Sequence, residues 1–351
     1  IMEQQEVSAF EKYLHEVDQI RQDSTTLAHH TLIRHPLLGK IPFELYDFQH
    51  ELLRNFKKHR YNIILKGRQL GITTVVAYHI AWLMNFFSDK EIVIISKQQS
   101  ASINVLKKVK LILRSFPAKY RSAIETDNVT NMLLANGSNC TAMGTTTDVG
   151  RSESLSLLVI DEAAIIKKAG DLWAAAKPTL ATGGSAIVLS TPKGIGNLFH
   201  RLYTGALIKE NDFFPTELPW YVHPDRDEAW LAEEKSSMTE KEFAQEHLCD
   251  FLLSGDNVVN IKNVHEYAEK NVYEPETKSG PGENLWTWKD PDIIKSYIVS
   301  ADVARGDGSD YSAFHVIDSV ELEQMAEYRG KLTTMEYAEL LVKTARYYNN
   351  A

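Results

Sequence analysis

Cysteine, long apolar runs and excess positive charge are what this chain of 351 residues lacks. Its two cysteines, Cys140 and Cys249, cannot form a disulfide framework, and this indicates a reducing compartment. No apolar run approaches the roughly 18 residues of a membrane span, and the acidic, polar start is unlike a secretory signal. A net charge of −9 argues against a surface coated in nucleic acid, although a local basic groove is compatible with it.

What is present predicts two globular domains, since 44% of the residues are hydrophobic. Residues 1–42 form a polar, partly helical segment, and residues 43–254 alternate apolar β-branched runs with helical patterns at 74–87 and 100–116. Strands are predicted at 62–65, 92–96, 157–160 and 186–190. Because these runs are apolar throughout, they favour a parallel sheet buried on both faces. This is a doubly wound α/β architecture, with ligands expected at the carboxyl ends of the strands.

A second pattern follows a polar, Pro- and Gly-containing segment at 255–295, which is predicted to be a linker or edge. From 296 to 351 the chain reads YIVSADVA, a turn, YSAFHVIDS, a turn, ELEQMAEYRG and a helix. Thr333 and Glu336 form a capping-box pair for that helix. The residues predicted for its buried stripe are Tyr337, Leu340, Leu341 and Tyr348. Three strands and a helix, with an aspartate ending the first strand, resemble the start of a ribonuclease H-like nuclease domain.

The segment YNIILKGRQLGITT, residues 61–74, has the layout of a phosphate-binding loop between a strand and a helix. The general pattern places lysine directly after the second glycine, where this chain has Ile72. Lys66 lies at the position of the first glycine, and its long side chain can reach phosphate from there. The alternative is an ordinary strand–turn–helix. The predicted nucleotide-binding residues of the loop are Lys66, Gly67, Arg68, Gln69, Gly71, Thr73 and Thr74.

Two adjacent acids end the apolar run LLVIDE at 157–162. Asp161 is placed to hold Mg²⁺ through water, with the Thr73 hydroxyl as a further ligand. Glu162 would orient and deprotonate the attacking water. The alternative is a helix cap after a buried strand. Two adjacent acids at the end of a parallel strand are costly without a cation or solvent, which favours the catalytic interpretation.

Further polar residues surround this pattern. Tyr46 and Gln49 precede the loop strand, and the Gln49 amide can both donate to and accept from an adenine edge. Ser190 and Thr191, in LSTPKG, end the next core strand and are candidates to sense the γ-phosphate and relay its loss. A surface glutamine and a plain β-turn are the competing interpretations.

Charge that develops on the γ-phosphate requires a guanidinium, supplied within the chain or by a neighbouring subunit. Arg68 is the candidate within the chain, and Arg151 is a candidate finger in trans. Arg151 serves equally well as a surface ion-pair residue.

In this order, Gln49, KGRQLGITT, ISKQQSA, LLVIDEAA and LSTPKG resemble the large terminase subunit of tailed bacteriophages. LPWYVHPDRDEAW at 218–230 and FAQEHLCDF at 243–251 extend the resemblance towards the end of the motor domain. It implies an ASCE-type P-loop ATPase, using ATP and Mg²⁺, that pumps double-stranded DNA into a preformed capsid. It also implies a ribonuclease H-like domain, using Mg²⁺ or Mn²⁺, that cuts the concatemer. Some terminases carry the loop lysine at the start of the motif, which supports Lys66.

The same resemblance implies partners and a location. The partners are double-stranded DNA, the portal protein, the small terminase subunit and further copies in a ring on the procapsid, with no membrane. The location is the host cytoplasm, at the procapsid. For contact with DNA phosphates, Lys107, Lys110 and Arg114 share one face of the 100–116 helix, although a solvated face explains them as well.

For the nuclease, the resemblance assigns Asp302 as the first metal ligand and Asp310, across a glycine-rich hairpin, as a second candidate. A calcium loop is excluded because Ala304 and Gly306 occupy its next ligand positions. A plain Asp/Gly hairpin remains the alternative for Asp310. The other catalytic acids are expected after the helix that ends near Tyr348, so the residues present are not expected to assemble a whole nuclease site.

Two other functions remain open. A superfamily 2 helicase shares most of these motifs, but it would continue into a second RecA-like domain rather than strands that carry Asp302. A nucleotide-binding scaffold without turnover is the other, and the intact set of Asp161, Glu162 and Thr73 argues against it.

Overall fold

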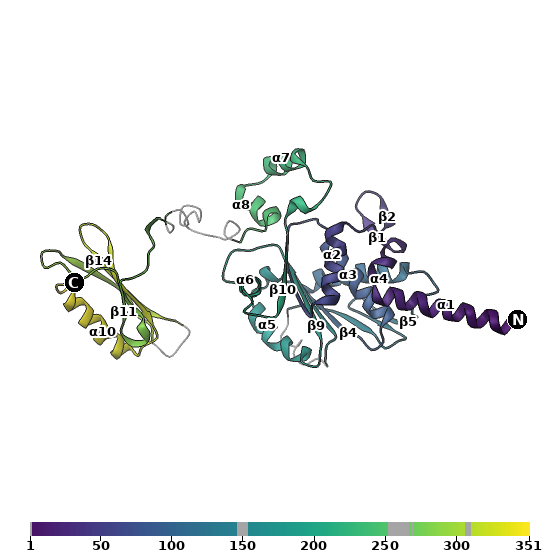
Figure 1. The fold of residues 1–351 in the computed structure, drawn as a ribbon, viewed down its shortest axis with the longest axis horizontal. Coiled ribbons are helices and arrows are strands. Elements are labelled where there is room, and N and C mark those ends of the chain that lie inside the picture. The colour runs from purple at the N-terminus through teal and green to yellow at the C-terminus, as the bar shows by residue number, and fades with distance from the viewer. Residues whose placement is uncertain (1, 146–153, 252–266, 268–269, 306–309) are drawn as a thin grey trace. The chain divides into compact units, whose positions relative to one another are not determined.

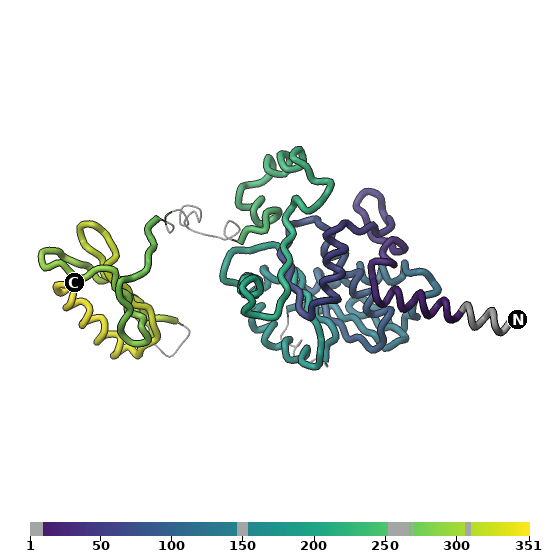
Figure 2. The backbone as a smooth tube through the Cα atoms, viewed as in Figure 1, coloured from purple at the N-terminus to yellow at the C-terminus, as the bar shows by residue number. Residues whose placement is uncertain are grey.

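The computed structural model describes residues 2–145, 154–251, 267, 270–305 and 310–351. The chain divides into two compact units, Ile1–Ile261 and Lys262–Ala351, which can be followed along the backbone in Figure 2. Part of the segment predicted as a linker or edge, 255–295, therefore belongs to the second unit. None of the helices in the described part of the chain is long and apolar enough to cross a membrane.

An eight-stranded sheet forms the centre of the first unit, in the order β10-β3-β9-β8-β4-β7-β6-β5 (Figure 1). Neighbours from β10 to β7 pair in parallel, whereas the pairs β7–β6 and β6–β5 are antiparallel. The strands are β3 (Tyr61–Lys66), β4 (Glu91–Ile95), β5 (Ile124–Asp127), β6 (Asn131–Leu134), β7 (Asn139–Met143), β8 (Leu157–Asp161), β9 (Ser185–Ser190) and β10 (Phe213–Leu218). This confirms the predicted α/β class with a mainly parallel sheet, and each of the four predicted strands lies within one residue of its place.

Helices cover both faces of this sheet (Figure 1), which explains why its strands are apolar throughout. Ile64 of β3 joins one buried cluster, whereas its neighbours Ile63 and Leu65 join the other. The first cluster includes residues of α2 (Asp47–Lys58), α3 (Ile72–Phe86) and α4 (Gln99–Ser115), and the second includes residues of α5 (Ala169–Ala176) and α6 (Leu198–Leu207). Residues on alternate sides of one strand thus bury against different helices.

The N-terminal segment packs on the same core. It contains α1 (Met2–Gln22), the 3₁₀ helix η1 (Ser24–His30) and a hairpin of β1 (Leu32–His35) and β2 (Gly39–Pro42). Ile20 and Leu27 are buried in the cluster with α3, and the Trp82 indole donates to the Ile20 carbonyl at 2.9 Å. After β10 come η5 (Trp220–Val222), α7 (Glu228–Ser237), α8 (Glu240–Phe243) and the π-helical turn η6 (Ala244–Leu248).

The second unit is a five-stranded antiparallel sheet in the order β11-β12-β15-β14-β13. Its elements are β11 (Thr277–Ser279), η7 (Pro281–Glu283), β12 (Leu285–Thr287), β13 (Tyr297–Asp302), β14 (Ser312–Asp318), β15 (Gln324–Gly330) and α10 (Thr334–Tyr347). The predicted three strands and helix are confirmed, and so is the capping box of Thr333 and Glu336. Tyr337 and Tyr348 are buried, with Leu340 and Leu341 packed half-buried beside them. The edge strand β11 and its neighbour β12 come from the segment predicted as a linker or edge.

Candidate functional site: the strand ends around the Lys66–Thr74 loop

The loop between β3 and α3 is shaped by backbone that only glycine adopts easily. Gly71 precedes the first helical residue with φ of 72°, in the left-handed region. A Cβ atom there would also lie 2.8 Å from the Gln49 amide nitrogen. Gly67 donates its N–H to the Leu218 carbonyl at 2.8 Å. The loop therefore leads from β3 directly into the N-terminus of α3, as a phosphate-binding loop requires.

Ile72 explains why this loop has no lysine after the second glycine. It is the first residue of α3 and is only 2% exposed, packed within the cluster that joins α3 to the sheet. The position faces the core, so an ammonium group there would have to leave apolar surroundings. Lys66, at the half-buried end of β3, is the lysine that the loop retains.

Thr73 and Asp161 meet as predicted. The Thr73 hydroxyl donates to the Asp161 carboxylate at 3.3 Å, and Asp161 is only 8% exposed at the end of β8. Burial raises the pKa of Asp161 above its ordinary range, Lys66 opposes that shift, and Glu162 adds to it. A hydroxyl beside a buried carboxylate is a set of hard oxygen donors, so the residues present fit Mg²⁺.

Glu162 follows Asp161 in an unusual backbone conformation. Its φ of 56° lies in the left-handed region, which residues other than glycine rarely adopt and which is often found at functional sites. Its carboxylate forms an ion pair with the ammonium of Lys97 at 3.2 Å. Lys97 was not among the residues predicted from the sequence, although its place just beyond β4, in ISKQQSA, is a signal that points to it.

Ser190 and Thr191 are buried at the end of β9. The Ser190 hydroxyl accepts a hydrogen bond from the Ala164 backbone N–H at 3.1 Å. Ala164 lies two residues after Glu162, so the structure joins the end of β9 to the turn that carries the two acids.

Tyr46 and Gln49 lie beside the loop, in positions that give them structural roles. The buried Gln49 amide donates to the Leu70 carbonyl at 3.0 Å and accepts from the Tyr46 N–H at 3.3 Å. The Tyr46 ring lies 4.6 Å from the His223 ring, and its hydroxyl donates to Asp225 at 3.3 Å. Gln49 thus links α2 to the loop through the Leu70 carbonyl.

Arg68 is held on the side of the loop that faces η6. Its guanidinium forms an ion pair with the Glu246 carboxylate, and the backbone N–H of Arg68 donates to the Glu246 carbonyl at 2.7 Å. Arg226, stacked on Trp230 at 4.4 Å, donates to the Arg68 carbonyl at 3.0 Å. The guanidinium predicted to face the γ-phosphate is therefore paired with a carboxylate of η6. The sequence does not show this pairing, because it does not reveal that η6 reaches the loop. Arg151, the other predicted guanidinium, lies outside the described residues.

The predicted face of basic residues on α4 is wrong in one position. Lys110 is 8% exposed, and its ammonium forms an ion pair with Asp127 at 2.8 Å. The same ammonium donates to the Asn131 carbonyl at 3.3 Å, so Lys110 is directed at the β5–β6 hairpin rather than at solvent. Arg114 is paired with the same carboxylate, whereas Lys107 is exposed to solvent.

The nuclease acids predicted in the second unit are isolated. Asp302 ends β13 and is exposed, and Asp310 is exposed near the start of β14. No group of three or more His, Cys, Asp or Glu side chains gathers as a metal site within the residues described here. Asp302 and Asp310 therefore do not make a two-metal site by themselves.

The fold and the loop together define a P-loop protein of the doubly wound α/β class. A family model described as "Terminase large subunit, T4likevirus-type, N-terminal" matches residues 63–265, more than half of the chain. The chain belongs to this family of phage large terminases.

Solved structures agree on the fold. The large terminase of bacteriophage HK97 is similar at 15% identity with a TM-score of 0.54, over 92% of this chain and 69% of that one. The large terminase of the thermophilic bacteriophage D6E is similar at 14% identity with a TM-score of 0.52, over 86% of this chain and 74% of that one. The D6E protein in complex with ADP matches with a TM-score of 0.51, at the same identity and coverage.

Proposed function

We propose that this chain is the ATP-hydrolysing motor of a phage large terminase, which drives double-stranded DNA into the procapsid. The observation that carries the proposal is the contact between Thr73 and Asp161, 3.3 Å apart, beside a loop whose remaining lysine is Lys66. Membership of the terminase family supports the same reaction. The D6E relative, described in complex with ADP and with ATP-γ-S, supports adenine nucleotides as the ligand.

Each residue has a chemical task in this proposal. Lys66 and the backbone N–H groups of the loop bind the β- and γ-phosphates. Thr73 and Asp161 hold Mg²⁺, which when bound neutralises charge on the phosphate oxygens. Glu162 accepts the proton of the attacking water, and Lys97, paired with it at 3.2 Å, is a positioning residue. The hydrogen bond from the Ala164 N–H to the Ser190 hydroxyl would transmit a movement of the turn that carries Glu162 to the end of β9.

The test is phosphate release from ATP by the whole chain, with and without Glu162→Gln. We expect the variant to bind a fluorescent ATP analogue as the parent does and to lose turnover by about 10²-fold or more, because only the general base is removed. Glu125→Gln, at an exposed position of β5, is the matched control. Binding of nucleotide with no hydrolysis by the parent chain would instead identify a scaffold.

We further propose that the second unit is the start of a ribonuclease H-like nuclease domain that uses Mg²⁺ or Mn²⁺. The support is the strand and helix order together with Asp302 at the end of β13. Two-metal cleavage needs acids beyond Asp302 and Asp310, so this chain should not cut plasmid DNA in Mn²⁺. Cleavage by the 351-residue chain that disappears in Asp302→Ala contradicts this.

The remaining proposals concern assembly. As a terminase motor the chain works as a ring of copies on the procapsid, with the portal protein and the small terminase subunit as partners, in the host cytoplasm. Arg151 is the candidate finger between copies. If it acts in trans, adding an excess of the catalytically dead Glu162→Gln chain to Arg151→Ala chains should restore part of the lost turnover.

A further inference from the structure

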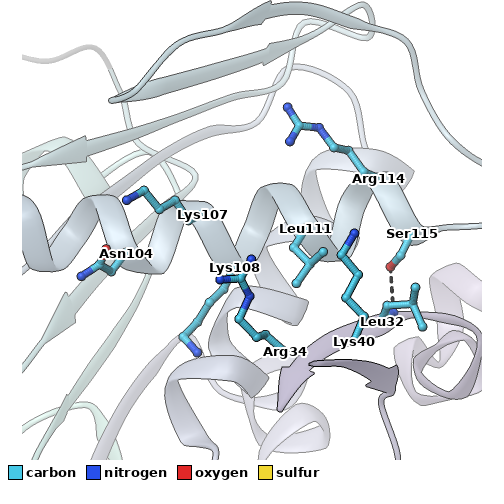
Figure 3. A pocket seen from close by; sticks show the side chains of 9 residues that line it. All are labelled: Leu32, Arg34, Lys40, Asn104, Lys107, Lys108, Leu111, Arg114 and Ser115. Atoms are coloured by element: carbon cyan, nitrogen blue, oxygen red, sulfur yellow. Dashed lines mark hydrogen bonds between the residues drawn. The ribbon is translucent and has the colours of Figure 1, made fainter. Parts of the chain in front are cut away.

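A basic groove of about 580 Å³ lies between α4 and the β1–β2 hairpin of the first unit. Figure 3 shows α4 above the hairpin strands, with side chains from both elements lining the space between them. The Ser115 hydroxyl accepts the Leu32 N–H at 2.8 Å, which fixes the hairpin to the C-terminal end of the helix. The two elements that form the groove are therefore held together by the fold itself.

The charge of this groove is of one sign. The five basic residues that line it are Arg34, Lys40, Lys107, Lys108 and Arg114, and no acidic residue lines it. Arg114 is neutralised by Asp127. For Arg34, Lys40 and Lys107, no ion pair is formed with any acid in the part of the chain that the structure describes. In a chain of net charge −9, such a concentration of unneutralised cations favours a polyanionic ligand.

Lys108 connects the groove to the candidate nucleotide site. Its half-buried ammonium donates to the Thr74 hydroxyl at 3.4 Å, and Thr74 follows Thr73, whose own hydroxyl contacts Asp161. Burial lowers the pKa of Lys108, Asp161 acts to raise it, and Arg34 acts to lower it. Lys108 therefore both lines the groove and contacts the first turn of α3.

The spacing of the cations separates two kinds of polyanion. Lys107 and Arg114 are seven residues apart on α4, about 10 Å along the helix axis, and Arg34 and Lys40 add charge from the facing hairpin. One DNA strand carries a phosphate about every 3.4 Å along the duplex axis, so several phosphates fall within this length. A single nucleotide would leave much of the groove uncompensated.

We propose that this groove binds the phosphodiester backbone of DNA and that Lys108 couples its occupancy to nucleotide binding at the Lys66–Thr74 loop. The proposal rests on the proposed motor function in that the DNA is the one being moved. Phosphates in the groove attract Lys108 away from Thr74, which changes the first turn of α3 where nucleotide binds. By linkage, DNA and nucleotide then alter each other's affinity by the same factor.

The first experiment measures binding of a fluorescent duplex to the whole chain without nucleotide, between about 50 and 200 mM salt. Each phosphate contact contributes about 0.9 to the slope of log affinity against log salt. Lys107→Ala should therefore make the slope shallower by about 0.9, and Arg34→Ala with Lys107→Ala by about twice that. Lys58→Ala, on the last turn of α2, is the control and should change neither slope nor affinity. Equal slopes for all of these variants overturn the groove.

Two competitors distinguish other occupants. If labelled polyglutamate binds as tightly as the duplex and loses the same affinity in Lys107→Ala, the groove is a docking site for acidic protein and the proposal is wrong. If Lys107→Ala weakens a fluorescent ADP analogue but leaves duplex binding unchanged, the groove belongs to the nucleotide site, and the proposal is again wrong.

The second experiment tests the coupling by equilibrium binding, so it does not depend on turnover. The affinity for the ADP analogue is measured with and without saturating duplex, and we expect a change of about fivefold or more in the parent chain. Lys108→Met, which keeps the apolar stem, should abolish this change, whereas Lys107→Met should retain it at saturating duplex. No change in the parent, or the same change in Lys108→Met, overturns the coupling. If the parent shows both effects but hydrolyses no ATP, the proposed motor function fails while this inference stands.

Discussion

Four strands in the described part of the chain end in aspartate, namely β5, β8, β13 and β14, and their carboxylates have different surroundings. Asp127 of β5 is paired with Lys110 and Arg114. Asp161 of β8 is buried at the end of a parallel strand, and burial raises its pKa. Asp318 of β14 is 1% exposed, yet its pKa is lowered to about 2, because the Glu321 N–H, Lys295 and the Val320 N–H all contact it. Asp302 of β13 is exposed at the edge of the sheet.

The two buried acids, Asp161 and Asp318, differ in how far protein groups compensate their charge. Asp318 is satisfied within its own unit, by N–H groups at 2.9 and 3.0 Å and an ammonium at 2.9 Å, so it stabilises a turn. Within the residues that the structure describes, the Asp161 carboxylate accepts hydrogen bonds only from the Thr73 hydroxyl and the Glu162 N–H. A buried carboxylate with incomplete compensation favours a bound cation. The position of an acid at a strand end is therefore less informative than what surrounds it.

Asp161→Asn against Asp302→Asn is the sharpest test of this comparison. The first removes a charged ligand for Mg²⁺ and should lower ATP turnover by about 10²-fold, since metal stabilisation of a phosphoryl oxygen is worth several kcal/mol. The second should leave turnover unchanged. Phosphate release by the two whole-chain variants measures both, and equal losses would refute the distinction.

Lys66→Ala should have the next largest effect, because it removes the loop cation that is proposed to bind the phosphates. Lys66 also opposes the rise in the pKa of Asp161. A hydrogen bond to a charged group is worth about 2 kcal/mol, or roughly 30-fold in nucleotide affinity. Titration with a fluorescent ATP analogue measures the loss. Wild-type affinity and turnover would mean that Arg68 leaves Glu246 and supplies the charge instead.

Ile72→Lys in the Lys66→Ala background tests whether the usual lysine position is usable. Since Ile72 is buried in the core, we expect no recovery of turnover and a loss of stability of about 1–2 kcal/mol, limited by the length of the lysine stem. Thermal unfolding and phosphate release are the measurements. Recovered turnover at unchanged stability would show that position 72 faces the phosphates.

Asp318→Asn should have the smallest effect on ATP turnover, because Asp318 lies in the second unit, and its effect on stability should depend on pH. The folded pKa of about 2 lies below the ordinary value of about 3.9, so the carboxylate contributes stability above about pH 4 and loses it as pH falls towards 2. The protection of peptides from β14 and β15 against hydrogen exchange, corrected for the intrinsic exchange rate at each pH, should fall over that interval in the parent chain. In Asp318→Asn this fall should be smaller, starting from a less protected state at pH 7.

The elements of the fold were predictable because each depends on local pattern. Continuous apolar runs indicated the four core strands, and the Thr333–Glu336 pair indicated the start of α10. The phosphate-binding loop and the pairing of Thr73 with Asp161 were also predictable, since the carboxyl ends of parallel strands meet at one edge of the sheet. The short strands β11 and β12 were not predicted from the sequence, because each is only three residues long and β11 is polar.

The α/β class, the phosphate-binding loop and the family could therefore be predicted from the sequence. The partners of the polar and charged residues follow only from the folded structure, in which Gln49 donates to the Leu70 carbonyl. Lys97, Arg68 and Lys110 form ion pairs there with Glu162, Glu246 and Asp127. Folding also brought Arg34 and Lys40 opposite α4 to form the basic groove. A strand or loop is specified by neighbours along the chain, whereas a charge acquires its role from groups that folding brings near it.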